Sequence, residues 1–401
     1  MSVKKSVNAL ENFKSYVGCF LRNGKLIPAY GSEIMCDDFP SGVTFTAHPK
    51  LISGCLFGTD SELHISGDLK HFQKITSVNG GVTPFMAEYS RFFEAFVTVI
   101  WGDKAVHIIN GKLAETEELP YSLSCAVVHC GRLFGADSER KFILRWSKAD
   151  NFQDNSEELH LSGNVTLSPE RGGILNLLVF KGKIVAVREY GLTVLSALSS
   201  PENFGFDFTD TDCDKIYKNT ARIVGNKLYF YSVSGLKYFD GSKISAVESQ
   251  HAVSAPVAAC EYAGKYYVAG TCAKLNRRVI LCVNLSDGES CIIDVPAETL
   301  LAKEGVYYSH GSTFNKIIEG TKYSFESGSI DFGTGKLKTV TQIDVQGKAD
   351  LRISNGVCTR IFTGACGIVR PHLRGRSFTI TVDGEEQLNA VTVTAEVTDE
   401  I

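Results

Sequence analysis

The sequence predicts an all-β protein: a six- or seven-bladed β-propeller followed by a small C-terminal β-sandwich. Two recurring phrases predict the propeller. In the first, an apolar strand runs into Ser, then a short polar turn and Phe, and its copies end at Phe72, Phe152 and Phe204, 80 and 52 residues apart. Because propeller blades repeat about every 40–50 residues, these intervals correspond to two blades and one. The second phrase is a hairpin whose turns, at Asn110 and Asp240, lie 130 residues apart, or about three blades.

Glycine-led apolar strands mark the individual blades. Each strand follows a turn glycine, where a positive φ carries no strain, and each is as apolar as a buried strand. Seven such strands predict seven blades, or six if one is an additional strand. The segment 17–27 is expected to supply the strand that closes the ring, because an open propeller leaves an edge able to pair with another chain. The seven strands lie at 54–58, 96–102, 131–137, 182–187, 225–231, 264–270 and 305–309.

The pattern changes after Gly333, which divides the chain into a propeller at 1–333 and a sandwich at 334–401. Beyond this point the strands alternate cleanly between apolar and polar residues, and the turns are short. Five such strands in about 65 residues are typical of a small β-sandwich. They are predicted at 338–345, 349–353, 359–362, 377–382 and 391–397.

Composition and charge narrow the class of protein. The 401 residues carry a formal net charge of −4, which does not suggest a general nucleic-acid binder. We expect no membrane span and no signal peptide, because long apolar runs are missing and polar residues follow Lys4 and Lys5. Most of the twelve cysteines lie in apolar strands and are expected to be free thiols. Cys358 and Cys366, which flank a hairpin, are the one pair considered for a disulfide.

No residue pattern predicts a catalytic centre, a cofactor or a metal site. The densest carboxylate cluster begins like a calcium-binding loop, with Asp210, Asp212 and Asp214 in alternation. Lys215 stands where the sharp turn of such a loop requires Gly. The cluster is therefore interpreted as a solvated loop.

Three aromatic residues of the strand-and-turn phrases, Trp146, Phe152 and Phe204, are interpreted as structural residues of turns and blade cores. Their recurrence favours a packing role because a blade repeats its core positions as it repeats its strands. Loss of such a side chain is expected to open a cavity.

One concentrated basic stretch, 370–376, supplies the candidate partner-contact residues Arg370, Arg374 and Arg376. Three interpretations stay open for it. The stretch contacts an acidic surface of a partner, or it contacts DNA, or it is a polar sandwich edge. In the last case Pro371 and the charges would guard the edge against unwanted strand pairing.

Several of these phrases resemble β-propeller tail structural proteins of tailed double-stranded DNA phages and prophages. The resemblance covers most of the chain and consists of strand-and-turn phrases, without catalytic signatures. The residues that carry it are 131–137 leading to 144–147 and 150–152, then the exit strand 329–333 and the closing stretch 373–378.

The resemblance implies a non-enzymatic virion component that is assembled in the host bacterial cytoplasm. It transfers no active-site residues and no cofactor. We expect a tail nozzle, hub or tail-associated module that forms a homo-oligomer by symmetric contacts and binds other tail or virion proteins, with no membrane span and no role in nucleic-acid contact. Two alternatives stay open: a module that binds a receptor or a surface polysaccharide, and a propeller glycosidase.

Overall fold

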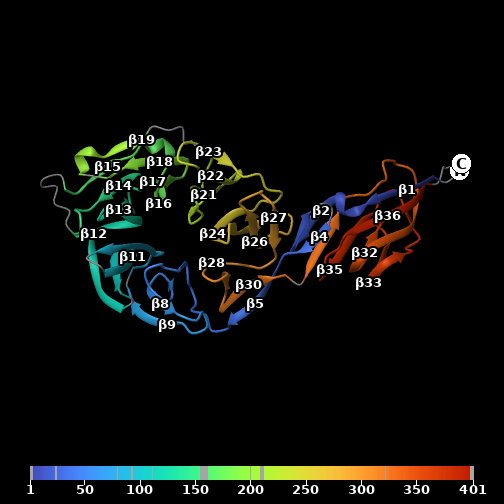
Figure 1. Cartoon of the computed structure of the whole chain (residues 1–401), viewed down its shortest axis with the longest axis horizontal. Coiled ribbons are helices and arrows are strands. Elements are labelled where there is room, and N and C mark those ends of the chain that lie inside the picture. The colour runs from blue at the N-terminus through green and yellow to red at the C-terminus, as the bar shows by residue number, and fades with distance from the viewer. Residues whose placement is uncertain are drawn as a thin grey trace.

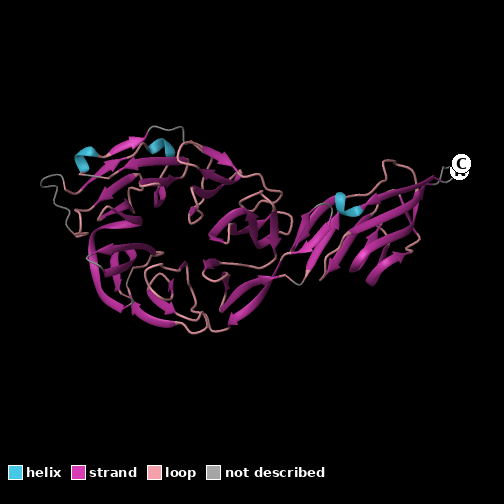
Figure 2. Cartoon of the chain, in the orientation of Figure 1, coloured by secondary structure: helices cyan, strands magenta, loops and turns pink. Residues whose placement is uncertain are grey.

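The computed structural model describes residues 3–22, 25–78, 80–91, 94–110, 112–153, 161–198, 200–207, 212–320 and 322–397. These residues form a ring of sheets and, beside it, an elongated sheet that contains both the first and the last described strands (Figure 1). Strands supply nearly all the regular structure, which confirms the all-β prediction (Figure 2). The helices of the described part are short 3-10 turns, and none has the length and hydropathy needed to span a bilayer. They are η1 (Ala9–Glu11), η3 (Pro169–Arg171) and η4 (Pro201–Asn203).

Five four-stranded antiparallel sheets make up most of the ring. Four of them use consecutive strands, and the fifth takes one strand from near the N-terminus. The first sheet contains β6 (Phe45–Ala47), β7 (Cys55–Gly58), β8 (Glu62–Ser66) and β9 (Gln73–Ser77). The next three contain β16 (Ile174–Phe180), β17 (Lys183–Arg188), β18 (Gly191–Ser196) and β19 (Gly205–Asp207); β20 (Arg222–Val224), β21 (Lys227–Ser232), β22 (Gly235–Phe239) and β23 (Ile244–Ala246); and β24 (Ser254–Tyr262), β25 (Lys265–Cys272), β26 (Arg277–Asn284) and β27 (Ser290–Ile293).

The hairpins of these sheets form where the sequence places turn glycines. Lys181 and Gly182 join β16 to β17 with φ angles of 51° and 72°, and Ala263 and Gly264 join β24 to β25 with 51° and 74°. Two successive positive φ angles define a tight turn whose twist matches that of the flanking strands. The glycine is needed because a side chain at the second position would be strained.

A six-stranded sheet completes the ring between the sheet of β6–β9 and the sheet of β16–β19. Its second strand folds back on itself: Asn110 N donates to Ala95 O (2.9 Å), and Thr98 Oγ1 lies 2.9 Å from His107 Nδ1. Its third strand pairs with the second between Lys112 and Glu118 and again at Leu123, and it pairs with the fourth from Leu123 to His129. The strands are β10 (Phe85–Arg91), β11 (Glu94–Ile109), β12 (Lys112–His129), β13 (Arg132–Asp137), β14 (Ile143–Trp146) and β15 (Gly163–Thr166).

The ring is closed by β5 (Tyr30–Cys36), which pairs with β30 (Thr313–Glu319) beyond β28 (Thr299–Ala302) and β29 (Val306–His310). The expected closing segment, 17–27, lies elsewhere and contributes to a hairpin of β3 (Cys19–Arg22) and β4 (Lys25–Pro28). The hydroxyl of Tyr30 accepts a hydrogen bond from Lys265 Nζ (2.6 Å), which anchors the closing strand to the neighbouring sheet.

The elongated sheet contains eight strands around β32 (Lys338–Ser354). Along one side β32 pairs first with β36 and then with β35, and it changes partner at Gly347, whose φ is 137°. β32 stays paired with neighbouring strands on both sides of Gly347. The unit is therefore one curled sheet and not the expected sandwich of two separate sheets. The other strands are β1 (Val3–Asn8), β2 (Phe13–Val17), β31 (Tyr323–Ser327), β33 (Thr359–Val369), β34 (Leu373–Gly375), β35 (Thr379–Gly384) and β36 (Ala390–Val397).

Strand pairing places the boundary between the two units differently from the predicted division at residue 333. β1 pairs with β36 and β2 pairs with β31, so N-terminal residues and residues 323–327 are part of the elongated sheet. Leu10 and Phe325, both fully buried, belong to the core of that sheet. The physical reason is that a strand joins whichever edge buries its apolar face, whatever the distance along the chain.

Two further features of the described residues are the free cysteines and a hydrogen bond of Trp101. All twelve cysteines are free, including Cys358 and Cys366. Trp101 in β11 is fully buried, and its indole Nε1 donates to Thr59 O (2.9 Å) in the turn between β7 and β8. This bond connects two neighbouring sheets of the ring.

Candidate functional site

One edge of the elongated sheet has no strand partner among the described residues. β33 and β34 follow one another along β32 and pair with no other strand of that set. β33 lies at the lower side of this sheet in Figure 1. A long unpaired edge exposes backbone donors and acceptors, so it is a place where another chain can add.

The β32–β33 turn brings two distant segments together at the end of this edge. Asn355 Nδ2 donates to Arg374 O (2.8 Å), while its Oδ1 accepts from the backbone N of Val357 (2.9 Å). These bonds fix the turn beside β34. Val357, at the tip of the turn, is 91% exposed.

Apolar side chains lie open on β33. Ile361 is 65% exposed and Ile368 is 52% exposed, and they sit opposite Arg352 and Asp344 of β32. They therefore lie on the outer side of the sheet, away from the core residues Leu351 and Ile343. Single exposed apolar residues are common on soluble proteins, so these two make a candidate contact surface only together with the unpaired edge.

The predicted contact residues lie on this same edge. Arg370, Arg374 and Arg376 are all exposed, and none forms an ion pair with another described residue. The stretch 351–382 contains five arginines and no Asp or Glu, in a chain whose formal net charge is −4. We call the residues 357–376 the basic edge. Its uncompensated charge creates a local positive potential that attracts anionic groups.

The edge is interrupted at its middle. The register between β32 and β33 shifts on either side of Ala365, and Gly364 and Gly367 both have positive φ. Pro371 follows, with no N–H to donate. Bulges and proline are devices that limit edge pairing, so regular pairing is confined to short stretches such as 359–362.

The aromatic residues of the strand-and-turn phrases do not form one site. Trp146 and Phe204 pack together with ring centroids 5.4 Å apart, and Phe134 contacts both. Phe152 instead packs on Tyr89 of β10, 5.1 Å away. The contacts of Phe204 join two neighbouring sheets of the ring, whereas Phe134–Trp146 and Phe152–Tyr89 lie within the six-stranded sheet and its loop.

The described residues of the carboxylate cluster, Asp212 and Asp214, form two separate ion pairs. Arg171 Nη2 lies 2.6 Å from Asp212 Oδ1, and Asp214 pairs with Lys237. Burial alone would raise the pKa of Asp214, but hydrogen bonds from Lys237, Cys213 and Ser234 outweigh it and hold that pKa well below its usual range. Asp210 lies outside the described residues. No trio of His, Cys, Asp or Glu in the described part is placed to hold a metal ion.

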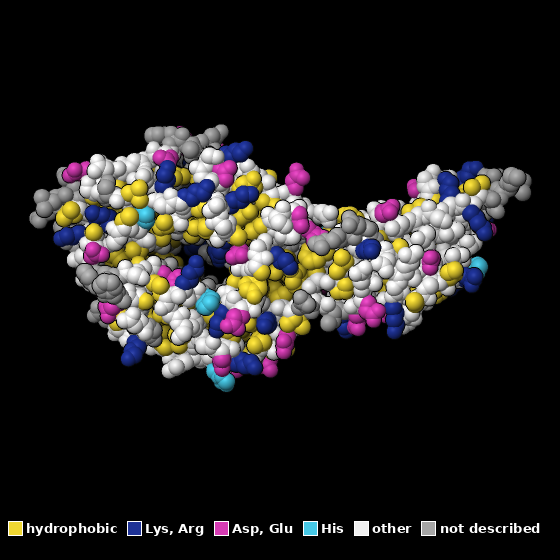
Figure 3. Space-filling model, in the orientation of Figure 1, with side chains coloured by type: hydrophobic (Ala, Val, Ile, Leu, Met, Phe, Trp, Pro, Cys, Tyr) yellow, Lys and Arg dark blue, Asp and Glu magenta, His cyan; other side chains and the backbone are white. Residues whose placement is uncertain are grey.

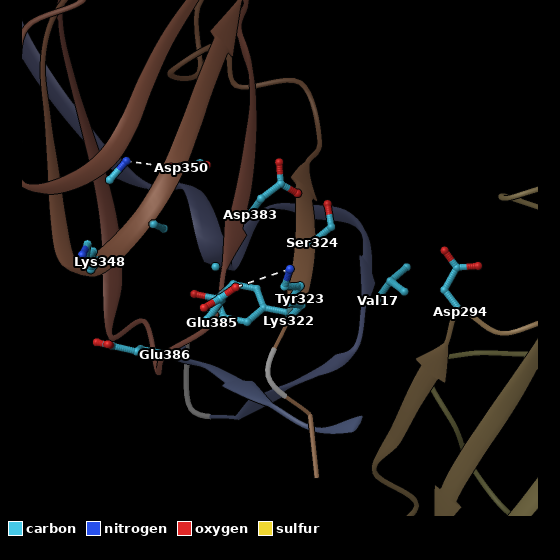
Figure 4. A pocket seen from close by; sticks show the side chains of 13 residues that line it. Val17, Asp294, Lys322, Tyr323, Ser324, Lys348, Asp350, Asp383, Glu385 and Glu386 are labelled. Carbon is cyan, nitrogen blue, oxygen red and sulfur yellow. Dashed lines mark hydrogen bonds and ion pairs between the residues drawn. The ribbon is translucent and has the colours of Figure 1, made fainter. Parts of the chain in front are cut away.

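A cleft of about 600 Å³ lies where the elongated sheet meets the ring (Figure 4). Its ion pairs are peripheral: Lys322 Nζ lies 3.6 Å from Glu385 Oε1, and Arg352 Nη2 lies 3.2 Å from Asp383 Oδ2. These side chains are mostly exposed, so solvent screens the pairs and they add little stability. The lining residues are Val17, Asp294, Lys322, Tyr323, Ser324, Lys348, Ala349, Asp350, Gly364, Asp383, Gly384, Glu385 and Glu386.

The sequence predicts three arginines of the basic edge, Arg370, Arg374 and Arg376, but Arg360 and the exposed apolar side chains were missed. The sequence signal for a basic surface is the absence of Asp and Glu across 351–382, a stretch that contains five arginines. The exposure of Val357 and Ile361 had no signal of its own, because apolar residues in an alternating strand are expected to face the core.

No protein-family model matches the chain, and no curated protein matches its sequence. Among solved structures, the computationally designed Ika8 protein is 12% identical, with a TM-score of 0.47 over 72% of this chain and 99% of that one. A streptogramin B lyase is 10% identical, with a TM-score of 0.47 over 72% and 98%. Virginiamycin B lyase from Staphylococcus aureus is 10% identical, with a TM-score of 0.45 over 79% and 99%. The function must therefore be argued from this chain's own residues.

Proposed function

We propose that this protein is a non-enzymatic structural component of a phage tail, assembled in the bacterial cytoplasm, which binds its neighbours through the basic edge. One observation carries the proposal. The edge combines unpaired backbone, exposed apolar side chains and arginines without counter-charges, all within 357–376. Covering such a surface removes apolar area from water and pairs the free charges, so it favours association with another protein.

The architecture supports a scaffold role. We count the six-stranded sheet as two blades that share β12, because β11 folds back on itself and β12 pairs in two directions. The ring is then a seven-bladed propeller closed by β5. A closed ring presents broad rigid faces with few free edges, which suits a subunit of a larger assembly.

The basic edge lies on the elongated sheet, outside the ring, where another copy can contact it, which supports symmetric assembly (Figure 1). Charges of both signs and scattered apolar groups cover the face seen in Figure 3. An edge that contacts a different surface of the next copy generates a ring or a tube, as a tail nozzle or hub requires. The tail context itself comes from the resemblance of the strand-and-turn phrases.

Quantitative mass spectrometry of tail particles purified from cells that carry the gene tests the proposal. We expect recovery of this chain at a small fixed copy number such as about three, six or twelve, in keeping with closed symmetry. The double variant Arg374→Glu/Arg376→Glu should fold normally and lose most of its incorporation. A matched variant, Lys243→Glu/Arg278→Glu, changes the charge equally on the ring and should incorporate normally. Absence of the wild-type chain from particles would refute the tail role, and normal incorporation of the first variant would refute the edge as the contact.

A further inference from the structure

We propose that the basic edge binds an acidic, extended segment of a partner protein, which adds as a β-strand along 359–362. The inference deepens the proposed function and rests on it for the identity of the partner as a neighbouring subunit or tail protein. It names the chemistry of that contact, which the proposed function leaves open.

The backbone of 359–362 is suited to strand addition. These four residues pair one to one with 351–354 on one side, and no described strand lies on the other. The stretch contains neither Pro nor Gly, so every residue keeps its N–H and its preference for extended backbone. The break at Gly364 ends the regular pairing, which limits the added strand to a short segment.

The side chains beside this backbone define what the added strand must carry. Ile361, 65% exposed, and Val357, 91% exposed, offer apolar contacts at the free edge. In a β-strand alternate residues share a face, so a segment with apolar residues at every second position covers them. The remaining positions of that segment then face solvent or the arginines.

Arginines lie on both sides of the β32–β33 turn. Arg360 lies within the pairing stretch, and the hydrogen bond from Asn355 to Arg374 O holds β34, with Arg374 and Arg376, beside the turn that precedes it. The guanidinium group matches a carboxylate in planar, two-point geometry. Asp350 Oδ1 accepts from the backbone N of Gly364 (2.6 Å), and no ion pair joins Arg360, Arg374 or Arg376 to a described residue, so Asp or Glu of a partner is the counter-charge that we infer.

Two other occupants fit less well. A nucleic acid would neutralise the arginines, but it has no row of alternating N–H and C=O groups to pair with the strand edge and no apolar side chain for Ile361. A second copy of the same edge would pair with the backbone, but it would bring the arginines of both copies together, and like charges in register are destabilising.

Fluorescence anisotropy with the full-length protein tests the proposal directly. The probe is a fluorescein-labelled eight-residue peptide that alternates Glu and Val. The comparison probes are the same peptide with Lys in place of Glu, the same peptide with alternate amides N-methylated, and a single-stranded oligo-dT. We expect the Glu–Val peptide to bind, with affinity that falls as salt is added, and to bind at least tenfold more tightly than each comparison probe.

Charge-reversal variants locate the contact. Arg360→Glu/Arg374→Glu/Arg376→Glu should weaken binding of the Glu–Val peptide at least tenfold. A matched triple variant on the ring, Lys112→Glu/Lys243→Glu/Arg278→Glu, should change it less than twofold. Because a variant of the edge could also unfold, hydrogen–deuterium exchange of the wild-type protein provides a second measurement. The amides of 359–362 should gain protection when the peptide is added.

Three results would overturn the proposal: equal binding of the N-methylated peptide, tighter binding of oligo-dT, or no added protection at 359–362. Failure to bind the Glu–Val peptide at millimolar concentration would also overturn it. None of these results bears on incorporation into particles, so the proposed function and this inference fail separately.

Discussion

Replacement of Trp101 by Phe should destabilise the ring more than the same replacement at Trp146. Trp101 is fully buried, and its indole N–H donates to the carbonyl of Thr59 (2.9 Å). Phe would leave that buried carbonyl unpaired, at about 1–3 kcal/mol. The smaller ring would leave part of the site empty, at roughly 1–2 kcal/mol more. We therefore expect the free energy of unfolding to fall by about 2–5 kcal/mol.

Trp146 is the matched control because the chain contains only two tryptophans. Its indole Nε1 has no hydrogen-bond partner among the described residues, and the side chain is half-buried. Trp146→Phe therefore breaks no bond and should lower the free energy of unfolding by only about 1–2 kcal/mol. Urea unfolding followed by circular dichroism measures both values under the same conditions. Each variant retains one tryptophan, so its fluorescence provides an independent second probe.

The prediction is tested by the difference between the two variants in the free energy of unfolding. We expect Trp101→Phe to be the more destabilising by about 1–3 kcal/mol, the value of the lost hydrogen bond and the unpaired carbonyl. Equal effects of the two substitutions would show that the Trp101–Thr59 bond contributes nothing between neighbouring sheets. A larger effect at Trp146 would show that the packing between sheets has been assigned to the wrong residue.

Two further predictions concern His251, whose ring packs on Tyr16 of β2 with centroids 4.5 Å apart, and Gly384 of β35. Burial lowers the pKa of His251 from 6.5 to about 4, so below pH 6.5 the unfolded chain takes up a proton that the folded protein resists. The stability that neutral His251 contributes is complete above pH 6.5 and is lost as the pH falls toward 4. Between pH 7 and 4.5, the free energy of unfolding should therefore fall by about 2 kcal/mol more in wild type than in His251→Asn. A pH dependence unchanged by the substitution would mean that His251 protonates as easily in the folded protein as in the unfolded chain. A Cβ at Gly384 would overlap Tyr323 Oη, so Gly384→Ala should lower the melting temperature by several degrees while Gly335→Ala, which meets no atom, should not. Equal melting temperatures would mean that Tyr323 moves aside freely.

Local features of the fold could be predicted from sequence, because short-range geometry determines them. The hairpins at Gly182 and Gly264 follow from the need for a positive φ after an apolar strand, and the structure shows both. The repeat of these hairpins was enough to predict an all-β propeller. Their number does not settle the blade count, since one strand such as β11 can fold back on itself.

Long-range pairing could not be predicted. β1 has only two apolar residues, Val3 and Val7, with Lys5 between them on the same face, and Val3 is exposed. Its sequence therefore does not identify β36 as its partner. The boundary at residue 333 was therefore drawn by composition and missed the N-terminal strands. The arginines of the basic edge were visible because charge can be read directly, whereas the exposure of Ile361 depends on which face of β33 meets the core.

The pairing of β1 with β36 limits when the elongated sheet can form during synthesis. Val3 pairs with Val397, and β5 pairs with β30, so neither the sheet nor the ring can be completed until distant segments have left the ribosome. At translation rates of about 5–20 residues per second, the N-terminal strands wait on the order of tens of seconds for their partners. Contacts of such high sequence separation are slow to form and leave unpaired strands open to other chains. This topology therefore leaves β1 and β5 without their sheet partners until β36 and β30 have been synthesised.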